Sequence, residues 1–158
     1  MVYGGASVGL MGLVADAALG NGGEVIGVIP DKLFAGEVAH EGLTELHVVR
    51  SMHERKALMS QLADAFVALP GGFGTVEEVI EAVTWTQLGI HGKAVGLLDV
   101  DGYFDHLVAF LDRAVDDGLL KPAARSLLCH DRDPERLLDR LASMSEGAAV
   151  DPSAAPAP

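Results

Sequence analysis

The segment best suited to bind a ligand is residues 69–78, where a short apolar run ends and a helical pattern begins. Gly71, Gly72 and Gly74 fall within it, and glycines allow the backbone to approach a ligand closely. The free N–H groups at the start of a helix bind anions, and Thr75 adds a hydroxyl donor. The alternative is an ordinary glycine-rich connection in which Thr75 only caps the helix. The position after a strand favours a phosphate-binding loop.

Helical geometry separates the glutamates that follow this loop. The helical pattern carries an apolar stripe of four residues, Val76, Val79, Ile80 and Val83. Glu77 and Glu81 are four residues apart and share the outer face, where we expect contact with solvent. Glu78 is rotated by about 100° from Glu77 and flanks the stripe. Two interpretations of Glu78 stay open: a catalytic carboxylate, or an acid that stabilises the start of the helix.

An arginine lies on the apolar face of the preceding helical pattern. Its neighbours on that face are three apolar residues, Met52, Met59 and Leu62. Lys56 lies along the edge of the same face, beside Met59 and Ala63. Because burial of an unpaired guanidinium is costly, Arg55 requires an anionic partner. We expect Glu78, a bound phosphate or both; the alternative is an Arg55 side chain that extends to solvent.

A second glycine-rich turn covers residues 4–12, which also follow a short apolar run and open a helical pattern. This turn is a weaker ligand candidate. Strand-to-helix turns and close helix packing use glycine as well, so the pattern alone does not indicate binding.

The sequence predicts neither a metal site nor a cofactor. None of the six histidines shows a spacing typical of zinc ligands: His40, His47, His53, His91, His106 and His130. No serine lies in a nucleophile-elbow pattern, and Cys129 lies in an apolar run where we expect burial. No lysine lies in a context that marks a cofactor Schiff base.

The composition excludes several classes of partner. The chain has 158 residues and a formal charge of −12, from 23 acidic and 11 basic side chains. Such an acidic protein repels polyanions, which excludes a nucleic acid polymer and requires a local positive site for any small anion. No apolar run approaches the roughly 20 residues that span a bilayer, so we expect no membrane partner. A start without a signal-peptide pattern and a single cysteine predict a cytoplasmic protein.

Strands that alternate with helices must position these residues. Apolar runs predict strands over 2–3, 25–29, 46–49, 65–69, 94–98 and 126–129. Helical spacing predicts helices over 8–19, 52–63, 76–88, 103–117 and 134–143, and Ser51 and Glu54 form a capping box. The pattern predicts an α/β fold with a Rossmann-like, doubly wound, mostly parallel sheet. We expect one domain over 1–145 and a disordered tail over 146–158.

Five segments of the chain occur in a characteristic order. They are 4–12 (GGASVGLMG), 52–56 (MHERK), 70–78 (PGGFGTVEE), 84–89 (TWTQLG) and 100–103 (VDGY). Together they resemble the LOG (Lonely Guy) family of cytokinin riboside 5′-monophosphate phosphoribohydrolases, many of which carry the older description of lysine decarboxylases. The resemblance extends to about Leu141.

The resemblance implies an enzyme that releases free base and ribose 5-phosphate from a nucleotide, commonly as a homodimer. It implies that Arg55 and Glu78 form the catalytic pair. It also implies a set of nucleotide-binding residues: Glu37, Lys56, Gly72, Phe73, Gly74, Thr75, Val76, Glu77 and Thr84. The chemistry is consistent, because positive charge develops on the ribose as the N-glycosidic bond breaks. Glu78 can stabilise that charge and orient water, while Arg55 holds the substrate and keeps Glu78 ionised.

The sequence departs from the family pattern at two places. Family members have an earlier strand, loop and helix, whereas this chain begins at the second strand. We expect the absence of that central strand to open a gap in the sheet and to remove part of the nucleotide pocket. Ala6 stands where a third glycine is common.

Two other functions compete with hydrolysis. A nucleotide-binding or carrier protein on the same scaffold would hold the nucleotide without releasing its base. A decarboxylase that uses pyridoxal phosphate would require a Schiff-base lysine. The residues do not set the base, for which the resemblance implies adenine with or without an N6 side chain.

Overall fold

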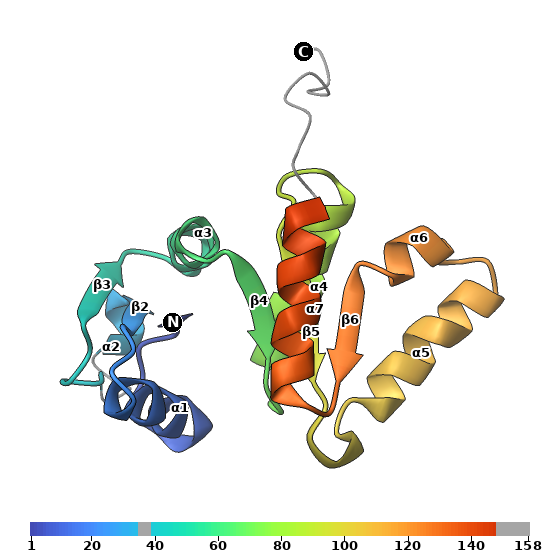
Figure 1. Ribbon diagram of the computed structural model, residues 1–158. Coiled ribbons are helices and arrows are strands. Elements are labelled where there is room, and N and C mark those ends of the chain that lie inside the picture. Colours follow the sequence, from blue (N-terminus) through green and yellow to red (C-terminus); the bar gives the residue numbers. More distant parts are fainter. Residues whose placement is uncertain (35–38, 148–158) are drawn as a thin grey trace. The chain divides into compact units, whose positions relative to one another are not determined.

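The computed structural model describes residues 1–34 and 39–147, which divide into two compact units (Figure 1). Unit 1 is Met1–Ala63, and unit 2 is Asp64–Pro158. Glu37 and the expected tail from residue 148 onward lie outside the described residues. Within the described ranges, no helix is long and apolar enough to cross a membrane.

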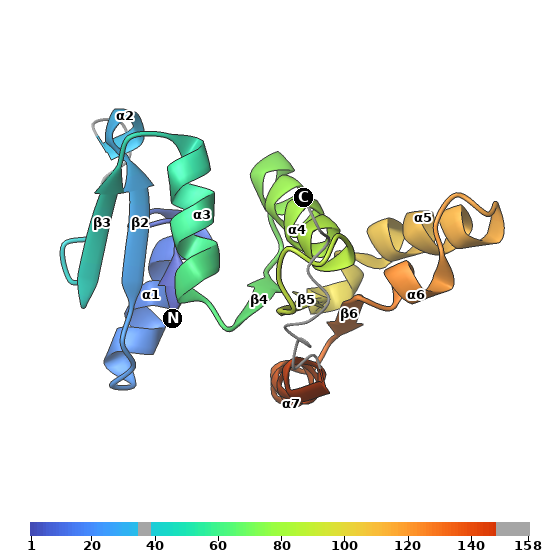
Figure 2. The same cartoon turned by 90° about the horizontal axis from the view of Figure 1, so that it is seen from above.

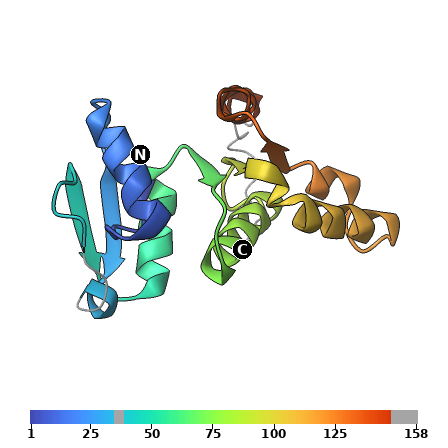
Figure 3. The same ribbon diagram turned by 90° about the horizontal axis from the view of Figure 1, so that it is seen from below.

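Unit 1 is a small parallel sheet with a helix on each face. Its elements are β1 (Val2–Tyr3), α1 (Gly9–Gly20), β2 (Ile26–Pro30), α2 (Asp31–Phe34), β3 (Glu45–Val49) and α3 (Met52–Leu62). The strands pair in parallel in the order β1-β2-β3. Figures 1 and 3 show α1 and α3 on opposite faces of this sheet. Tyr3, Ala15 and Val25 form a buried cluster on the side of α1.

Unit 2 has the same kind of architecture. Its elements are β4 (Ala65–Ala68), α4 (Phe73–Gln87), β5 (Ala94–Leu98), the 3-10 turn η1 (Val100–Gly102), α5 (Asp105–Asp116), α6 (Pro122–Arg125), β6 (Leu128–Asp131) and α7 (Pro134–Gly147). The strands pair in parallel in the order β4-β5-β6. Figure 2 shows α4 on one face of the sheet and α7 on the other.

The central strand β5 packs against helices on both of its faces. Val95 and Leu97 point into one core, which includes Val79 of α4 and Phe104. Ala94 points into the other core, with Cys129 and the α7 residues Leu137 and Leu141. Gly96 allows α7 to approach, because a Cβ at this position would lie 2.9 Å from Leu137 Cδ1. The uninterrupted apolar run of β5 therefore reflects burial from both sides.

The α/β class and the parallel strands are confirmed, with the strands arranged as two three-stranded sheets. Every predicted strand and helix is present, but several boundaries differ. The last helix, α7, continues to Gly147, beyond the predicted end at Ser143 and into the first two residues of the expected disordered tail. The helix after the glycine loop begins at Phe73 instead of Val76, and the last strand begins at Leu128 instead of Ser126. The helix predicted from Tyr103 begins at Asp105, because η1 contains positive φ angles at Asp101 (52°) and Gly102 (76°). The four-residue helices α2 and α6 were not predicted, since one turn carries no periodic pattern.

Candidate functional site

The glycine loop leads directly into α4 at the carboxyl end of β4. Gly72 is the N-cap residue of α4, and as a glycine it has no side chain to cap this end of the helix. The interpretation of Thr75 as the helix cap is therefore wrong, since Thr75 lies inside the first turn. Phe73 is 98% exposed, and Gly72 and Gly74 are exposed as well. The geometry is that of an open helix N-terminus, whose N–H groups suit an anion.

Two side chains of unit 2 adjoin the peptide that precedes this N-terminus. A Cβ on Gly71 would overlap the Thr75 hydroxyl and lie 2.9 Å from Thr75 Cβ, so residue 71 must lack a side chain. The Tyr103 hydroxyl donates a hydrogen bond of 2.7 Å to the Gly71 carbonyl oxygen. The sequence interpretation did not identify Tyr103 as a site residue, although it lies in one of the five characteristic segments.

The buried face of α4 is rotated from the predicted stripe. Val79 and Ala82 are buried, whereas Ile80 is 39% exposed. Glu77 is exposed as predicted, but Glu81, also expected to be solvated, is half-buried. Glu78 is half-buried, one turn before Ala82 along the helix. This burial distinguishes Glu78 from a freely solvated acid and leaves both interpretations of its role open.

The two remaining α4 residues of the predicted site differ in exposure. Val76 is half-buried beside the glycine loop. Thr84 is exposed, and its hydroxyl donates a 2.7 Å hydrogen bond to the Ile80 carbonyl of its own helix. Thr84 therefore requires a change of rotamer, or a bond through its second lone pair, to contact a ligand.

In unit 1, the Arg55 side chain contacts the middle of β2 and the residue that follows β1. Its Nε donates a 3.1 Å hydrogen bond to the Val28 carbonyl oxygen in β2. Its guanidinium lies against Gly4, which follows β1 directly, and a Cβ on Gly4 would overlap it. Arg55 and Lys56 are both half-buried. The sequence predicts an anionic partner for Arg55. The structure adds a neutral partner, because a backbone carbonyl oxygen accepts a hydrogen bond from one side of the guanidinium.

The apolar face predicted around Arg55 is only partly buried. Met59 is half-buried, whereas Met52 is 42% exposed and Leu62 is 38% exposed. The start of α3 is well defined: the Glu54 N–H donates to Ser51 Oγ at 3.1 Å, which confirms half of the capping box. The Glu54 carboxylate reaches back to the N–H of Arg50, one residue earlier than expected, at 2.8 Å. This cap fixes the first turn from which Arg55 projects.

The second glycine-rich turn is built for close packing. Gly5 and Gly9 have positive φ angles of 80° and 60°. Ala6 is fully buried and forms an antiparallel bridge with Ala39, so the methyl group at this position is accommodated. The Tyr3 hydroxyl donates to the Ala6 carbonyl at 3.2 Å. Gly4, which directly follows β1, lies against the guanidinium of the predicted site residue Arg55.

A buried aspartate holds the turn that presents Tyr103. Asp99 follows β5, is 1% exposed, and accepts hydrogen bonds from the Phe104 N–H at 2.7 Å and from Arg132 Nε at 3.2 Å. Burial alone would raise the pKa of Asp99, but these hydrogen bonds outweigh it and hold the pKa below its ordinary value. The sequence interpretation did not identify this network. The only sequence feature that could have indicated this network is an aspartate that directly follows a predicted strand and precedes an Asp-Gly turn.

Other titratable groups of unit 2 are explained by packing. Burial raises the pKa of Cys129, in agreement with the expectation of an inert thiol. The His91 ring stacks on Phe66 and meets the edge of Trp85, and burial together with Lys93 lowers its pKa. Within residues 1–34 and 39–147, no three His, Cys, Asp or Glu side chains are arranged to hold a metal ion.

The amino-acid sequence of the chain is similar to those of several known proteins. A family model described as "Possible lysine decarboxylase" matches residues 11–141. A "Probable cytokinin riboside 5'-monophosphate phosphoribohydrolase" of Oryza sativa subsp. japonica is 56% identical over 141 residues, 89% of this chain and 62% of the relative. A "Cytokinin riboside 5'-monophosphate phosphoribohydrolase" of Arabidopsis thaliana is 51% identical over 141 residues, 89% of this chain and 65% of the relative. The chain thus spans less than two thirds of the length of these relatives. With a family model that matches most of its length and relatives that share half of their aligned residues, the chain belongs to the LOG family.

Proposed function

We propose that the chain hydrolyses the N-glycosidic bond of a nucleoside 5′-monophosphate and releases free base and ribose 5-phosphate. The observation that carries the proposal is the uncapped, glycine-lined N-terminus of α4 at the carboxyl end of β4. The names of the relatives support this reaction and suggest a cytokinin riboside 5′-monophosphate, with AMP as the unmodified analogue. This range of substrates rests on the names and on the resemblance.

The glycine loop is proposed to bind the 5′-phosphate. The N–H groups of Gly72, Phe73 and Gly74 open the helix, where the helix dipole favours a dianion. Thr75 adds its hydroxyl, and Val76 and Glu77 complete the segment that contacts the nucleotide. Phosphate held here converts binding energy into position at the reacting carbon.

Glu78 and Arg55 are proposed as the catalytic pair. The bond between C1′ and the base nitrogen breaks with its electron pair going to the base, and positive charge builds on the ribose. The Glu78 carboxylate stabilises that charge and accepts a proton from the water that adds to C1′, and the departing base takes up a proton from the solvent. The Arg55 guanidinium is proposed to bind the substrate. Lys56, Thr84 and Glu37 are proposed to contact the nucleotide.

Further parts of the proposal rest on the resemblance and on composition. The chain is proposed to act as a homodimer without cofactor in the cytoplasm, with residues 1–145 as one nucleotide-binding hydrolase domain. Light scattering coupled to size-exclusion chromatography tests the dimer. A mass that corresponds to one chain at the concentration used for catalysis would contradict it.

The test of function is incubation of the chain with AMP and with N6-prenylated AMP, followed by chromatography. Equal amounts of base and ribose 5-phosphate are expected, and adenosine, which lacks the phosphate, is expected to react far more slowly. Retention of intact AMP by a chain that binds it would support the carrier function instead. Release of carbon dioxide from lysine only after addition of pyridoxal phosphate would support the decarboxylase.

A further inference from the structure

Tyr103 is placed so that it controls the direction of one peptide in the glycine loop. Its hydroxyl donates to the Gly71 carbonyl oxygen at 2.7 Å across 32 positions of sequence. Gly71 and Gly72 are adjacent glycines, and a peptide between glycines rotates more easily than any other, because neither residue has a Cβ. A hydrogen bond at this peptide therefore selects one orientation among several.

The orientation of the Gly71–Gly72 peptide determines where the N–H of Gly72 points. The Gly71–Gly72 peptide is trans, so its carbonyl and its N–H point in opposite directions. With the carbonyl turned toward Tyr103, the Gly72 N–H points away from Tyr103. In the reversed orientation, a carbonyl oxygen would take the place of that N–H, and it would repel an anion instead of binding it.

The tyrosine is itself held by the core of unit 2. The next residue, Phe104, is 2% exposed, and its N–H donates to the buried Asp99 carboxylate at 2.7 Å. The Tyr103 N–H donates to the Val100 carbonyl at 3.0 Å, which closes η1. The Tyr103 ring meets the edge of Phe104, with 5.1 Å between the ring centroids. These contacts fix the ring, although Tyr103 is 54% exposed.

We infer that Tyr103 is a positioning residue that sets the Gly71–Gly72 peptide for phosphate binding. This inference rests on the proposed function, since it assigns the glycine loop to the 5′-phosphate. The ring does not touch the reacting atoms; it acts through the loop backbone. Removal of the Tyr103 hydroxyl should weaken the binding of every ligand that carries the phosphate and leave the binding of ligands without phosphate unchanged.

The test compares the unmodified chain with Tyr103→Phe, which removes only the hydroxyl. The KM for AMP should rise by about tenfold, corresponding to the loss of one well-placed hydrogen bond, with kcat within about twofold. The inhibition constant of ribose 5-phosphate should rise by about the same factor as KM, while that of adenine should not change. A rise in both inhibition constants, or in neither, would overturn the inference.

Ser126→Ala serves as the matched control. Its exposed hydroxyl also donates to a backbone carbonyl of unit 2, that of Ala123, at 2.8 Å. This variant should leave KM, kcat and both inhibition constants unchanged. An equal rise in KM in both variants would show a general loss of structure and would overturn the role of Tyr103.

Calorimetric titration with AMP separates this inference from the proposed function. If the unmodified chain binds AMP without releasing adenine, hydrolysis is contradicted while the role of Tyr103 is still decided by affinity. Weaker AMP binding by Tyr103→Phe then supports the role, and equal binding overturns it. Normal hydrolysis with an unchanged KM in the variant would contradict the role alone.

Discussion

The guanidinium of Arg55 occupies the space that any side chain at residue 4 would need. An ideal Cβ built on Gly4 overlaps Arg55 Nη2 and lies 3.3 Å from Arg55 Cζ. Gly4 is therefore explained by the arginine that lies over it, at the carboxyl end of β1. The pair links a weak glycine signal in the sequence to the proposed catalytic machinery.

Gly4→Ala is expected to displace Arg55 without unfolding unit 1. The overlapping atoms belong to the far end of a flexible side chain, which moves more readily than the backbone. The value of kcat/KM for AMP should fall by about 100-fold, because small errors in position are costly in catalysis. The free energy of unfolding should fall by only about 1 kcal/mol, the value of the bond to Val28. Steady-state kinetics and urea unfolding measure the two quantities.

Gly20→Ala is the matched control for this substitution. Gly20 ends α1, and a Cβ there would have no neighbour within 4 Å. Its kinetics should equal those of the unmodified chain. A Gly4→Ala variant with the same kcat/KM as this control would show that the position of Arg55 does not matter for turnover.

Glu78→Gln is expected to lower kcat by about 10²- to 10⁴-fold, since the amide neither carries charge nor accepts a proton from water. The KM for AMP should change little, because the phosphate is proposed to bind to the N–H groups at the start of α4 and not to Glu78. Glu81→Gln, on the same helix and also half-buried, provides the control and should retain kcat. If the two substitutions have equal effects, Glu78 acts only through the charge of the helix.

The fold was largely predictable because the two patterns that mark it, continuous apolar runs for buried strands and capping residues for helix starts, each involve residues that are close together in the sequence. Buried strands such as β5 are continuous apolar runs, and the capped start of α3 is visible as Ser51 and Glu54. The start of α4 was misplaced because Gly72 caps it without a side chain, so the usual sequence signal is absent. The rotated core face of α4 depends on which neighbours pack against it, and periodicity alone does not contain that information.

The candidate site was only partly predictable, because some of its contacts join distant segments. The open helix N-terminus follows from glycines that are adjacent in sequence. The bond from Tyr103 to Gly71 and the contact between Arg55 and Gly4 depend on strand order and on side-chain direction. Asp99 was missed for the same reason, since its partners Phe104 and Arg132 meet only after β5 and β6 have paired.

The stability of unit 2 is expected to fall as the pH decreases below about 6.5, because of His91. Burial lowers the pKa of His91, with a further contribution from Lys93, so the folded state favours the neutral imidazole. His91 Nδ1 accepts from the Lys93 N–H at 3.2 Å. The unfolded chain takes up the proton first as the pH falls, which lowers the free energy of unfolding. Above the pKa of the unfolded state, His91 is neutral in both the folded and the unfolded chain, and the dependence of stability on pH disappears.

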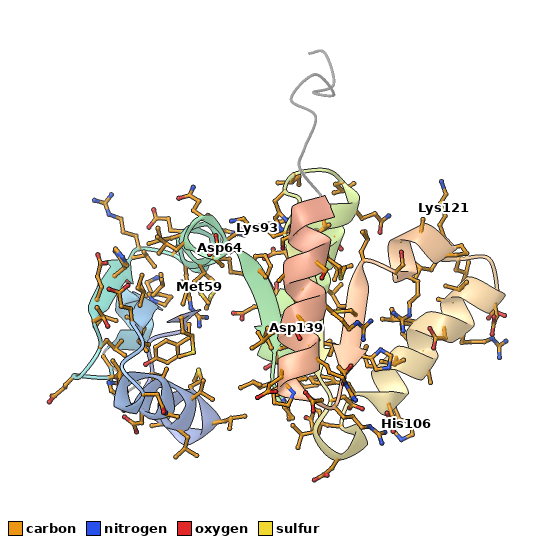
Figure 4. All side chains as sticks on the ribbon, viewed as in Figure 1. Met59, Asp64, Lys93, His106, Lys121 and Asp139 are labelled. Atoms are coloured by element: carbon orange, nitrogen blue, oxygen red, sulfur yellow. The ribbon has the colours of Figure 1, made fainter. Side chains whose placement is uncertain are left out.

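Urea unfolding followed by fluorescence of Trp85, the single tryptophan, measures this dependence between pH 5 and pH 8. His91→Asn should reduce the slope of the free energy of unfolding against pH over this range. His106→Asn, at an exposed position on α5 (Figure 4), should retain the slope of the unmodified chain. Identical slopes in the unmodified chain and in His91→Asn would contradict the assignment.

A second pH dependence is expected in acid, from Asp131 at the carboxyl end of β6. Hydrogen bonds from Arg136 and from the Asp133 N–H hold the pKa of Asp131 at about 2, below the ordinary 3.8. The stabilisation is complete above about pH 4 and is lost as the pH falls through 2, because protonation removes the charge that Arg136 contacts. Asp131→Asn should therefore unfold with a shallower dependence on pH between 4 and 2 than the unmodified chain. Asp139→Asn, an exposed substitution on α7 shown in Figure 4, should behave as the unmodified chain does, and a change of slope in this control instead would assign the effect to net charge.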